Sequence, residues 1–269
     1  MGMRDWFFQH WFQQKQSRMM RGGFNALAAR IDADTDHFRV AGDANWLVNT
    51  ASPRSFSYWI KSNDGAWKTN AFHLCVGNTG GGAGSRFNAL MFGARDTTSG
   101  WWAGRLPTTA DDNGQHYLWT APAATTGLWR HVLVVVDFAQ AQLDRMRLYV
   151  DGSLVTLGGG IGTTATSFFA SSQPFAIGSN SAGQTTRTIN DSSLDEFAIY
   201  NTALGAADAL EHYNGGRSRD LRSLASASGL MSYWRFGDTP GDTVSAVQDL
   251  VGGRTLTGFG APTFEGGTP

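Results

Sequence analysis

The chain has 269 residues, of which 34 are glycine and only 16% carry a formal charge, a composition that favours strands and tight turns over long charged helices. Its net charge of −1 argues against a general attraction to nucleic acid, and its single cysteine, Cys75, excludes an intrachain disulfide framework or a cysteine-based zinc cluster. No run of about 18 apolar residues is present, so the sequence predicts no transmembrane helix.

The first 23 residues are predicted to form a separate N-terminal helical arm. Their large aromatic side chains follow the i, i+1, i+4, i+5 spacing of an amphipathic helix, and Gly22-Gly23 ends the segment. These aromatic residues are Trp6, Phe7, Phe8, Trp11 and Phe12. Three interpretations are open: a helix that packs on its own domain, an arm that binds a partner protein, and a helix that lies on a membrane surface.

No export signal is expected. The longest apolar run near the N-terminus is Trp6-Phe7-Phe8, whereas a secretory signal requires a core of about 7–15 apolar residues. We therefore expect a protein that folds in the cytoplasm of the cell that makes it.

Short β-strands are predicted from residue 24 to residue 200. Residues 55–61, 129–137 and 146–150 alternate between apolar and polar side chains, and Gly, Asp, Asn and Pro bound these segments. Asp151-Gly152 is typical of the tight turn of a hairpin. Many short strands at this spacing predict an all-β fold built from two packed antiparallel sheets.

Several of these segments, taken in chain order, resemble the motifs of laminin-G-like domains in the concanavalin A-like lectin/glucanase superfamily. They are Ile31–Val40, Ser55–Lys61, Trp129–Val132, Leu148–Gly152, Phe175–Gly178 and Asp195–Leu204, the last followed by a short predicted helix. The resemblance implies a two-sheet antiparallel β-sandwich of the concanavalin A-like jelly-roll type over residues 24–214. The chain departs from the family pattern at Ala33, where the family has glycine, and in a long insert between residues 77 and 120.

Residues 215–269 contain a strand-like segment, Tyr233-Trp234-Arg235-Phe236, that precedes the domain in many laminin-G-like chains but follows it here. The roughly 40 residues from Gly229 onward bury too little apolar surface to form their own core. We therefore expect a C-terminal extension that packs on the sandwich, in preference to the start of a second repeat. This arrangement resembles laminin-G-like proteins of tailed bacteriophages.

The insert contains a candidate carbohydrate site. Two tryptophans lie between glycines in a predicted loop, and sugars stack on exposed indole rings while nearby polar side chains bind their hydroxyl groups. The predicted sugar-binding residues are Trp101, Trp102, Arg105, Asp111, Asp112 and Asn113. The alternative is that these indole rings pack inside or beneath the sandwich.

A calcium ion is the candidate cofactor. Calcium prefers carboxylate and carbonyl oxygen ligands, and the resemblance implies a site at the rim of the sandwich. The carboxylates at that rim are predicted to be Asp34 and Asp36 of the opening motif and Asp195 of the closing motif. The alternative is that these aspartates cap turns by accepting hydrogen bonds from backbone N–H groups.

Glutamate is scarce, since Glu196, Glu211 and Glu265 are the only three in the chain. None lies in the Glu-x-Asp-x-Glu pattern of the superfamily's glucanases. Strand alternation places Glu196 opposite Asp195, so the two are not expected to line one cleft. We expect no enzymatic activity and assign no catalytic residue; His131 is interpreted as a sheet residue.

Three functions follow from these features. The favoured one is a bacteriophage virion structural protein, a capsid decoration or tail-associated component with the sandwich exposed on the virion surface. Phage structural proteins need no export signal, because they assemble in the host cytoplasm and leave by lysis. The expected partners are capsid or tail proteins and a host-surface glycan, with self-association left open. The alternatives are a carbohydrate-binding module of a bacterial surface protein and a glycoside hydrolase.

Overall fold

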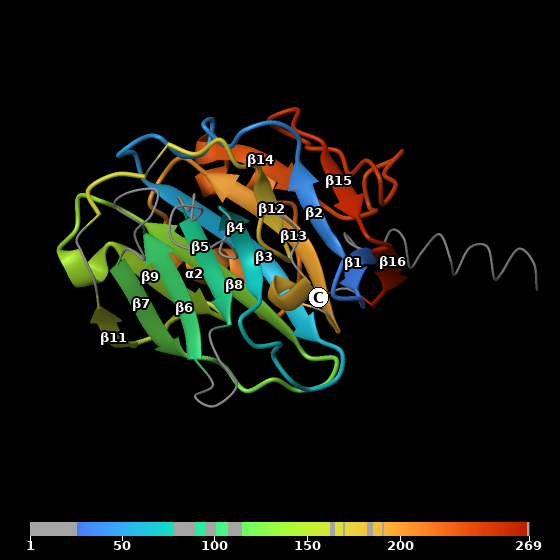
Figure 1. Ribbon diagram of the computed structural model, residues 1–269, viewed down its shortest axis with the longest axis horizontal. Helices are drawn as coiled ribbons and strands as arrows, with labels where there is room; N and C mark the ends of the chain where they lie inside the picture. Colours follow the sequence, from blue (N-terminus) through green and yellow to red (C-terminus); the bar gives the residue numbers. More distant parts are fainter. Residues whose placement is uncertain are drawn as a thin grey trace, which may run out of the picture.

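Two antiparallel β-sheets pack face to face in the computed structural model of the protein (Figure 1). The structure describes residues 26–77, 90–94, 101–106, 115–161, 165–168, 170–181, 185–189, 191–267 and 269. The predicted fold class, an all-β two-sheet sandwich consistent with a concanavalin A-like jelly roll, is confirmed. The predicted N-terminal arm, with Trp6, Phe7, Phe8, Trp11 and Phe12, lies outside the described residues.

The first sheet has the strand order β10-β9-β8-β3-β13-β1-β16, and β14 also pairs with β13. Its strands are β1 (Leu27–Ile31), β3 (Arg54–Ser62), β8 (Trp129–Val136), β9 (Met146–Val150), β10 (Ser153–Leu154), β13 (Ser192–Tyr200), β14 (Leu230–Trp234) and β16 (Thr263–Gly266). The predicted tight turn at Asp151-Gly152 joins β9 to β10, where both turn residues have positive φ angles, 50° and 77°.

The second sheet has the order β11-β7-β6-β5-β4-β12-β2-β15. Its strands are β2 (His37–Val40), β4 (Phe72–Val76), β5 (Leu90–Ala94), β6 (Trp101–Leu106), β7 (Gln115–Thr120), β11 (Leu157–Ile161), β12 (Phe175–Ile177) and β15 (Leu256–Phe259). The described residues contain one α-helix, α2 (Ala206–Tyr213), and four 3-10 turns, η1 (Gln142–Asp144), η2 (Thr185–Arg187), η3 (Leu221–Ser223) and η4 (Ala225–Gly229). None of the described helices is long and apolar enough to cross a membrane.

Aromatic side chains fill the space between the sheets. Phe56 and Tyr58 of β3 meet Phe175 of β12 and Phe197 of β13, and all four are fully buried. Each large apolar side chain buried in this way stabilises the fold by about 1.5–3 kcal/mol. A second apolar cluster, which includes Val135 and Ala209, lies between the outer face of the first sheet and α2.

Strands from both ends of the chain lie side by side in both sheets (Figure 1). In the first sheet β16 pairs with β1, and in the second sheet β15 pairs with β2. β14 pairs with the second half of β13, beyond the residues that pair with β1. The segment predicted as an extension, residues 215–269, therefore supplies strands to both sheets, and it brings residues near 257 next to residues near 39.

Candidate ligand-binding site

One of the tryptophans predicted to bind a sugar is part of the core. The predicted loop around it is a strand, β6, in which Trp102 is fully buried. Its ring packs edge-on against His73 and Phe92, with centroids 4.8 and 5.7 Å away. Because its indole ring is not accessible to a sugar, the predicted stacking role of Trp102 is wrong, and the alternative of a ring packed inside the sandwich is correct for this residue.

Of the other predicted sugar-binding residues, Arg105 is the one whose side chain the structure describes. Arg105 lies on the outer face of β6, where its register partners are Met91 of β5 and His116 of β7. For Trp101 the structure describes only the backbone, which belongs to β6. The remaining three, Asp111, Asp112 and Asn113, lie outside the described residues, so their role stays a prediction.

Asp36 caps loops rather than presenting a free carboxylate. It is 2% exposed, and its carboxylate oxygens accept hydrogen bonds from the backbone N–H groups of Ala33 and Ala261 at 3.1 and 2.7 Å. These contacts correspond to the alternative interpretation, turn capping, and they join the turn before β2 to the turn after β15.

The three aspartates predicted to hold calcium do not form one site. Asp34 lies 3.5 Å from the Lys68 ammonium group. Asp195 is buried in β13, where it accepts a hydrogen bond from the Glu196 N–H at 2.8 Å. In the described part of the chain, no group of three or more His, Cys, Asp or Glu side chains could hold a metal ion. The predicted ligand set of Asp34, Asp36 and Asp195 is therefore wrong, while calcium binding elsewhere stays a prediction.

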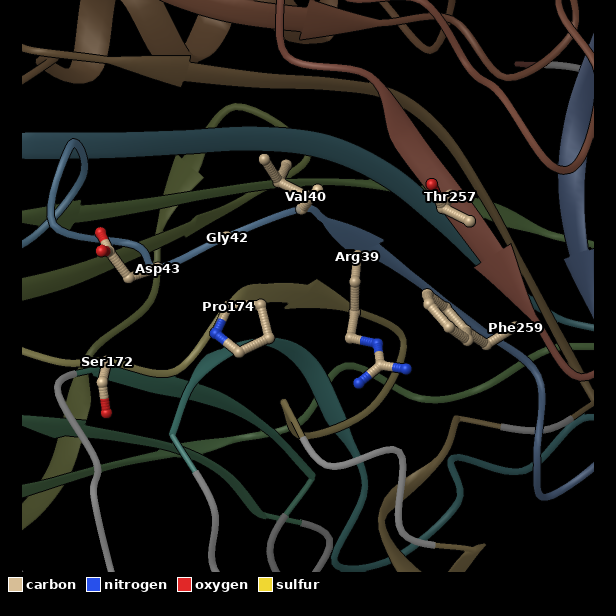
Figure 2. A pocket seen from close by; sticks show the side chains of 9 residues that line it. Arg39, Val40, Gly42, Asp43, Ser172, Pro174, Thr257 and Phe259 are labelled. Atoms are coloured by element: carbon tan, nitrogen blue, oxygen red, sulfur yellow. The ribbon is translucent and has the colours of Figure 1, made fainter.

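A pocket of about 570 Å³ lies at the edge of the second sheet, beside β2 and β15 (Figure 2). This volume is within the range of about 300–1,000 Å³ that is usual for small-molecule sites. Four parts of the chain line the pocket: strand β2, the turn that follows β2, the segment that precedes β12, and strand β15. The lining consists of Arg39, Val40, Ala41, Gly42, Asp43, Ser172, Pro174, Thr257 and Phe259.

The pocket wall formed by β2 and β15 is built from cross-strand pairs. Thr257 is opposite Arg39, and Phe259 is opposite His37. Because Phe38 and Val40 face the core, His37 and Arg39 share the outer face of the sheet. The Phe259 ring stacks on His37, with centroids 5.1 Å apart, and the Arg39 guanidinium lies 3.7 Å from its centroid. Phe259 therefore holds the guanidinium plane beside the pocket, as the close-up in Figure 2 shows.

Arg39 has few hydrogen-bond partners for a half-buried guanidinium. Its Nη1 donates to the carbonyl of Ser181 at 2.9 Å, while its Nε is buried without a partner. Burial lowers the pKa of Arg39 from its ordinary value. The guanidinium nevertheless stays charged at neutral pH. Asp43, on the opposite side of the pocket, accepts a hydrogen bond from the Asn45 N–H at 3.0 Å and caps its own turn.

Sequence reasoning did not find this pocket. The alternation of residues 37–40 could have shown that His37 and Arg39 share a face. Nothing local in the sequence indicates that Thr257 and Phe259 come from the C-terminal segment to complete the same surface. The pairing of β2 with β15 is a tertiary contact between opposite ends of the chain.

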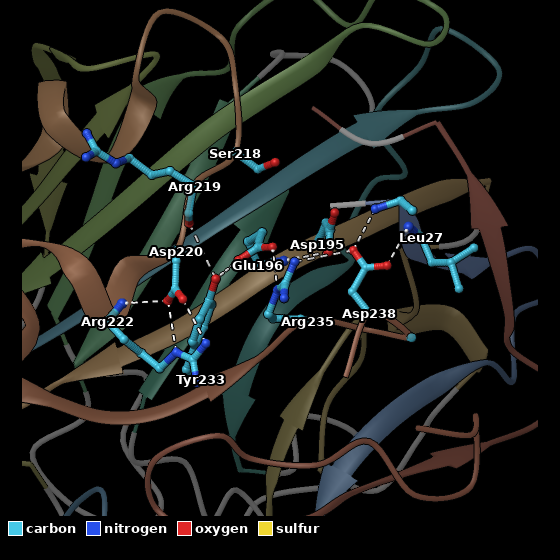
Figure 3. A network of polar contacts seen from close by, with 12 residues as sticks. Leu27, Asp195, Glu196, Ser218, Arg219, Asp220, Arg222, Tyr233, Arg235 and Asp238 are labelled. Carbon is cyan, nitrogen blue, oxygen red and sulfur yellow. Dashed lines mark hydrogen bonds and ion pairs between the residues drawn. The ribbon is translucent and has the colours of Figure 1, made fainter. Parts of the chain in front are cut away.

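A β-bulge in β13 places Glu196 on the same side of the first sheet as Asp195 (Figure 3). The register with β3 shifts between Asp195 and Ala198, and Glu196 has a φ of 50°. Leu194 and Phe197 consequently both face the core, which regular alternation would forbid. The expectation that Glu196 and Asp195 point to opposite faces was wrong, because the extra residue of the bulge breaks the period of two.

Glu196 is buried in a polar network that joins three strands (Figure 3). Its carboxylate accepts hydrogen bonds from the Tyr233 hydroxyl and, at 3.2 Å, from Arg235 Nε. Arg235 in turn lies 3.6 Å from Asp238, which accepts a hydrogen bond from the Ala26 N–H at 2.7 Å. Burial raises the pKa of Glu196 to about 8, an effect that the Arg235 charge opposes. The network holds the C-terminal segment against the sandwich.

A buried chain of serine and histidine side chains links the first sheet to α2. Ser57 Oγ lies 2.9 Å from His131 Nε2 and 3.0 Å from His212 Nδ1, and His212 Nε2 lies 3.0 Å from Ser226 Oγ. Both histidines are 1% exposed, and burial lowers their pKa values, that of His212 to about 4. No substrate can reach these groups, so His131 acts here as a hydrogen-bonded sheet residue.

Two solved structures share this architecture. A proposed carbohydrate-binding protein from Bacteroides ovatus ATCC 8483 superposes with a TM-score of 0.62 and 16% identity, over 90% of this chain and 60% of that one. The native heptameric SAP-like pentraxin from Limulus polyphemus gives a TM-score of 0.51 and 10% identity, over 73% of this chain and 86% of that one. The chain thus spans 60% of the length of the Bacteroides ovatus protein, and at these identities the likeness shows the fold alone.

A comparison with curated proteins finds no match. A family model does match, however, over a segment that contains most strands of both sheets and the start of α2. Residues 32–209 match the laminin-G-type family described as "Concanavalin A-like lectin/glucanases superfamily", and the chain therefore belongs to this family.

Proposed function

We propose that this chain is a non-enzymatic carbohydrate-binding β-sandwich whose ligand occupies the pocket beside β2 and β15. The observation that carries the proposal is the pocket, an open hollow of about 570 Å³ lined by a guanidinium, a carboxylate, two hydroxyl groups and apolar side chains. Polar groups placed on an apolar wall are typical of small-molecule sites. The family, and the description of the Bacteroides ovatus protein as a proposed carbohydrate-binding protein, favour the same class of ligand.

The positions of the carboxylates favour binding without hydrolysis. A glycosidase of the usual kind places two carboxyl groups about 5–9.5 Å apart on either side of the scissile bond. The described lining of the pocket contains one carboxylate, Asp43. Glu196 is buried in its network, and Glu265 is held by Lys61 and Arg30 at 2.8 and 2.9 Å. Neither the pocket nor these glutamates supplies the acid and base pair that hydrolysis requires.

The test is glycan binding to the full chain and to a variant with a filled pocket. Ser172 is exposed and lines the pocket, so Ser172→Trp should block it without disturbing the core. Ser153→Trp, at an exposed position on the edge strand of the other sheet, is the matched control. We expect glycan-array and calorimetric binding to be lost in the first variant and kept in the second, with equal melting temperatures. Equal binding by both variants would place the site elsewhere.

Our second proposal is that the chain is a virion structural protein, attached to a capsid or tail through its N-terminal arm, with the sandwich on the virion surface. The supporting observation is the aromatic sequence of the arm, which has five large rings within residues 6–12. Burial of each ring against a partner would contribute about 1.5–3 kcal/mol. The test is co-sedimentation with virus particles, which deletion of residues 1–21 should abolish while the melting temperature stays unchanged. Occupancy that survives the deletion would contradict attachment through the arm.

A further inference from the structure

The charge of Arg39 is not balanced within the described structure. Four other arginines, Arg30, Arg130, Arg222 and Arg235, form ion pairs with carboxylates at 2.6–3.6 Å. Arg39 forms no ion pair with any described residue; it contacts a backbone carbonyl and an aromatic ring. A half-buried cation without a counter-charge is unfavourable, and an anion in the pocket would supply the missing partner.

The geometry of Arg39 also suits a carboxylate. The guanidinium carbon lies 3.7 Å from the centroid of the Phe259 ring, and Nη1 is held by the Ser181 carbonyl at 2.9 Å, so two contacts restrict the side chain. The buried Nε has no acceptor. Because Nε is buried, the groups that remain to face the two oxygens of a carboxylate are the N–H groups of the two Nη atoms. The Arg39 side chain is thus ordered before a ligand binds, so it loses less conformational entropy on binding.

Two further arginines lie beyond the pocket, near the buried Cys75. Along one row of the outer face of the second sheet, Arg39 is paired with Ala176, Ala176 with Cys75, Cys75 with Met91, and Met91 with Arg105. Arg105 and Arg187 both act on the Cys75 thiol as nearby positive charges, opposing the rise in its pKa that burial causes. Asp43 is the one acidic residue in the described lining of the pocket. Within the described lining, an acidic group of a ligand would therefore pair with Arg39, while Asp43 could accept hydrogen bonds from hydroxyl groups.

We infer that the ligand of the pocket is an acidic saccharide, whose carboxylate pairs with the Arg39 guanidinium while its hydroxyl groups face Asp43, Ser172 and Thr257. This inference rests on the proposed carbohydrate-binding function and specifies its ligand class. Arg39 is the residue that discriminates an acidic sugar from its neutral form, and Phe259 is the residue that positions Arg39.

The experiment compares each acidic sugar with its own methyl ester, which has nearly the same shape but no charge. The probes are the methyl glycosides of glucuronic, galacturonic and N-acetylneuraminic acid, titrated into the full chain by calorimetry. We expect at least one acid to bind at least tenfold more tightly than its ester, and its affinity to fall with added salt. Arg39→Gln should remove the preference, so that the acid binds no more tightly than its ester, and Arg222→Gln, at an exposed ion pair outside the pocket, should leave the preference as it is in the wild type.

The outcomes separate this inference from the function on which it rests. Equal affinity for acid and ester in the wild-type chain, with both abolished by Ser172→Trp, would overturn the acidic ligand and leave carbohydrate binding in place. A preference for the acid that persists in Arg39→Gln would overturn the role of Arg39. Absence of binding to these probes and to a broad array of neutral glycans would overturn both the acidic ligand and the proposed carbohydrate-binding function. The comparison of acid with ester needs no variant, so it decides the question even where Arg39→Gln folds poorly.

Discussion

Glu196 of β13 and Tyr233 of β14 form a buried hydrogen bond between the family-matched sandwich and the segment that follows it. The carboxylate reaches Tyr233 because a bulge turns residue 196 out of the regular strand alternation. Arg235, two residues further along, provides the second contact to the same carboxylate. The C-terminal strands are thus held by a polar network as well as by the sheet hydrogen bonds of β14, β15 and β16.

The burial of Glu196 predicts a loss of stability as the pH rises from about 4.5 to about 8. Its pKa is about 8 in the folded protein, above the ordinary value of 4.5. The folded state therefore binds this proton more tightly than the unfolded state, so the stabilisation is complete below about pH 4.5 and is lost as the pH rises towards about 8. Glu196→Gln, which keeps the shape without the charge, should show a smaller fall in melting temperature from about pH 5 to about pH 9. If the melting temperatures of the wild type and of Glu196→Gln fell equally with rising pH, the raised pKa of Glu196 would be contradicted.

Loss of Arg235 should be more damaging than loss of Glu196. Arg235→Met leaves Glu196 buried without its cation, and where Glu196 is ionised, at alkaline pH, a broken buried ion pair typically destabilises a protein by about 3–5 kcal/mol. In the double variant with Glu196→Gln, no buried carboxylate is left at position 196, and we expect part of the stability to return. Urea denaturation of the single and double variants measures this coupling, and additive effects would mean that the two side chains act independently.

The buried histidines predict a second transition on the acidic side. Burial lowers the pKa of His73 to about 3 and that of His212 to about 4, from an ordinary value of 6.5. A base with a lowered folded pKa contributes stability that is complete above about pH 6.5 and is lost as the pH falls towards its folded pKa. His212→Asn should therefore weaken the protein at pH 7 but flatten its loss of stability between about pH 6.5 and pH 4, as followed by thermal melts. If the melting temperature of His212→Asn fell with decreasing pH as steeply as that of the wild type, other groups would dominate acid unfolding.

Trp102→Ala is expected to act on stability and not on ligand recognition. The side chain is fully buried between Trp67, His73 and Phe92, and a tryptophan removed from a core typically lowers the free energy of unfolding by about 3–5 kcal/mol. Trp102→Phe, which keeps most of the packing, should be milder and should bind glycan as the wild type does. Lost glycan binding with unchanged stability in Trp102→Phe would reinstate a direct role for this ring.

The sandwich could be predicted from the sequence because several of its strands alternate locally between apolar and polar side chains. Residues 55–61 and 146–150 alternate as strands β3 and β9 do, and the ordered family motifs indicated the fold. Irregularities were harder to predict. Trp102 was assigned to a loop because glycines flank it, although Gly104 only allows close packing against Met146. Trp129 lies at the start of an alternating segment and yet is partly exposed, and its indole N–H donates to the Gly267 carbonyl at 2.8 Å.

The candidate site was hidden for a different physical reason. Its pocket wall depends on β15, whose four residues have no strong strand pattern and gain their structure by pairing with β2. Arg39 and Phe259 become neighbours only through that pairing, so no local period or motif could associate them. The bulge at Glu196 is likewise determined by tertiary contacts with Tyr233 and Arg235, not by the nine-residue strand in which it lies.

Phe259 provides the sharpest test of how the C-terminal segment contributes to binding. Phe259→Ala removes the ring that holds the Arg39 guanidinium at 3.7 Å but no part of the core, since Phe259 is 37% exposed. A cation–π contact of this kind is worth about 0.5–2 kcal/mol, so we expect the affinity for an acidic saccharide to fall about 3- to 30-fold while the melting temperature changes little. Phe259→Tyr retains the ring and should bind as the wild type does. If Phe259→Ala binds normally, the hydrogen bond to the Ser181 carbonyl alone is sufficient to orient Arg39, and β15 contributes shape to the pocket but no control over its charge.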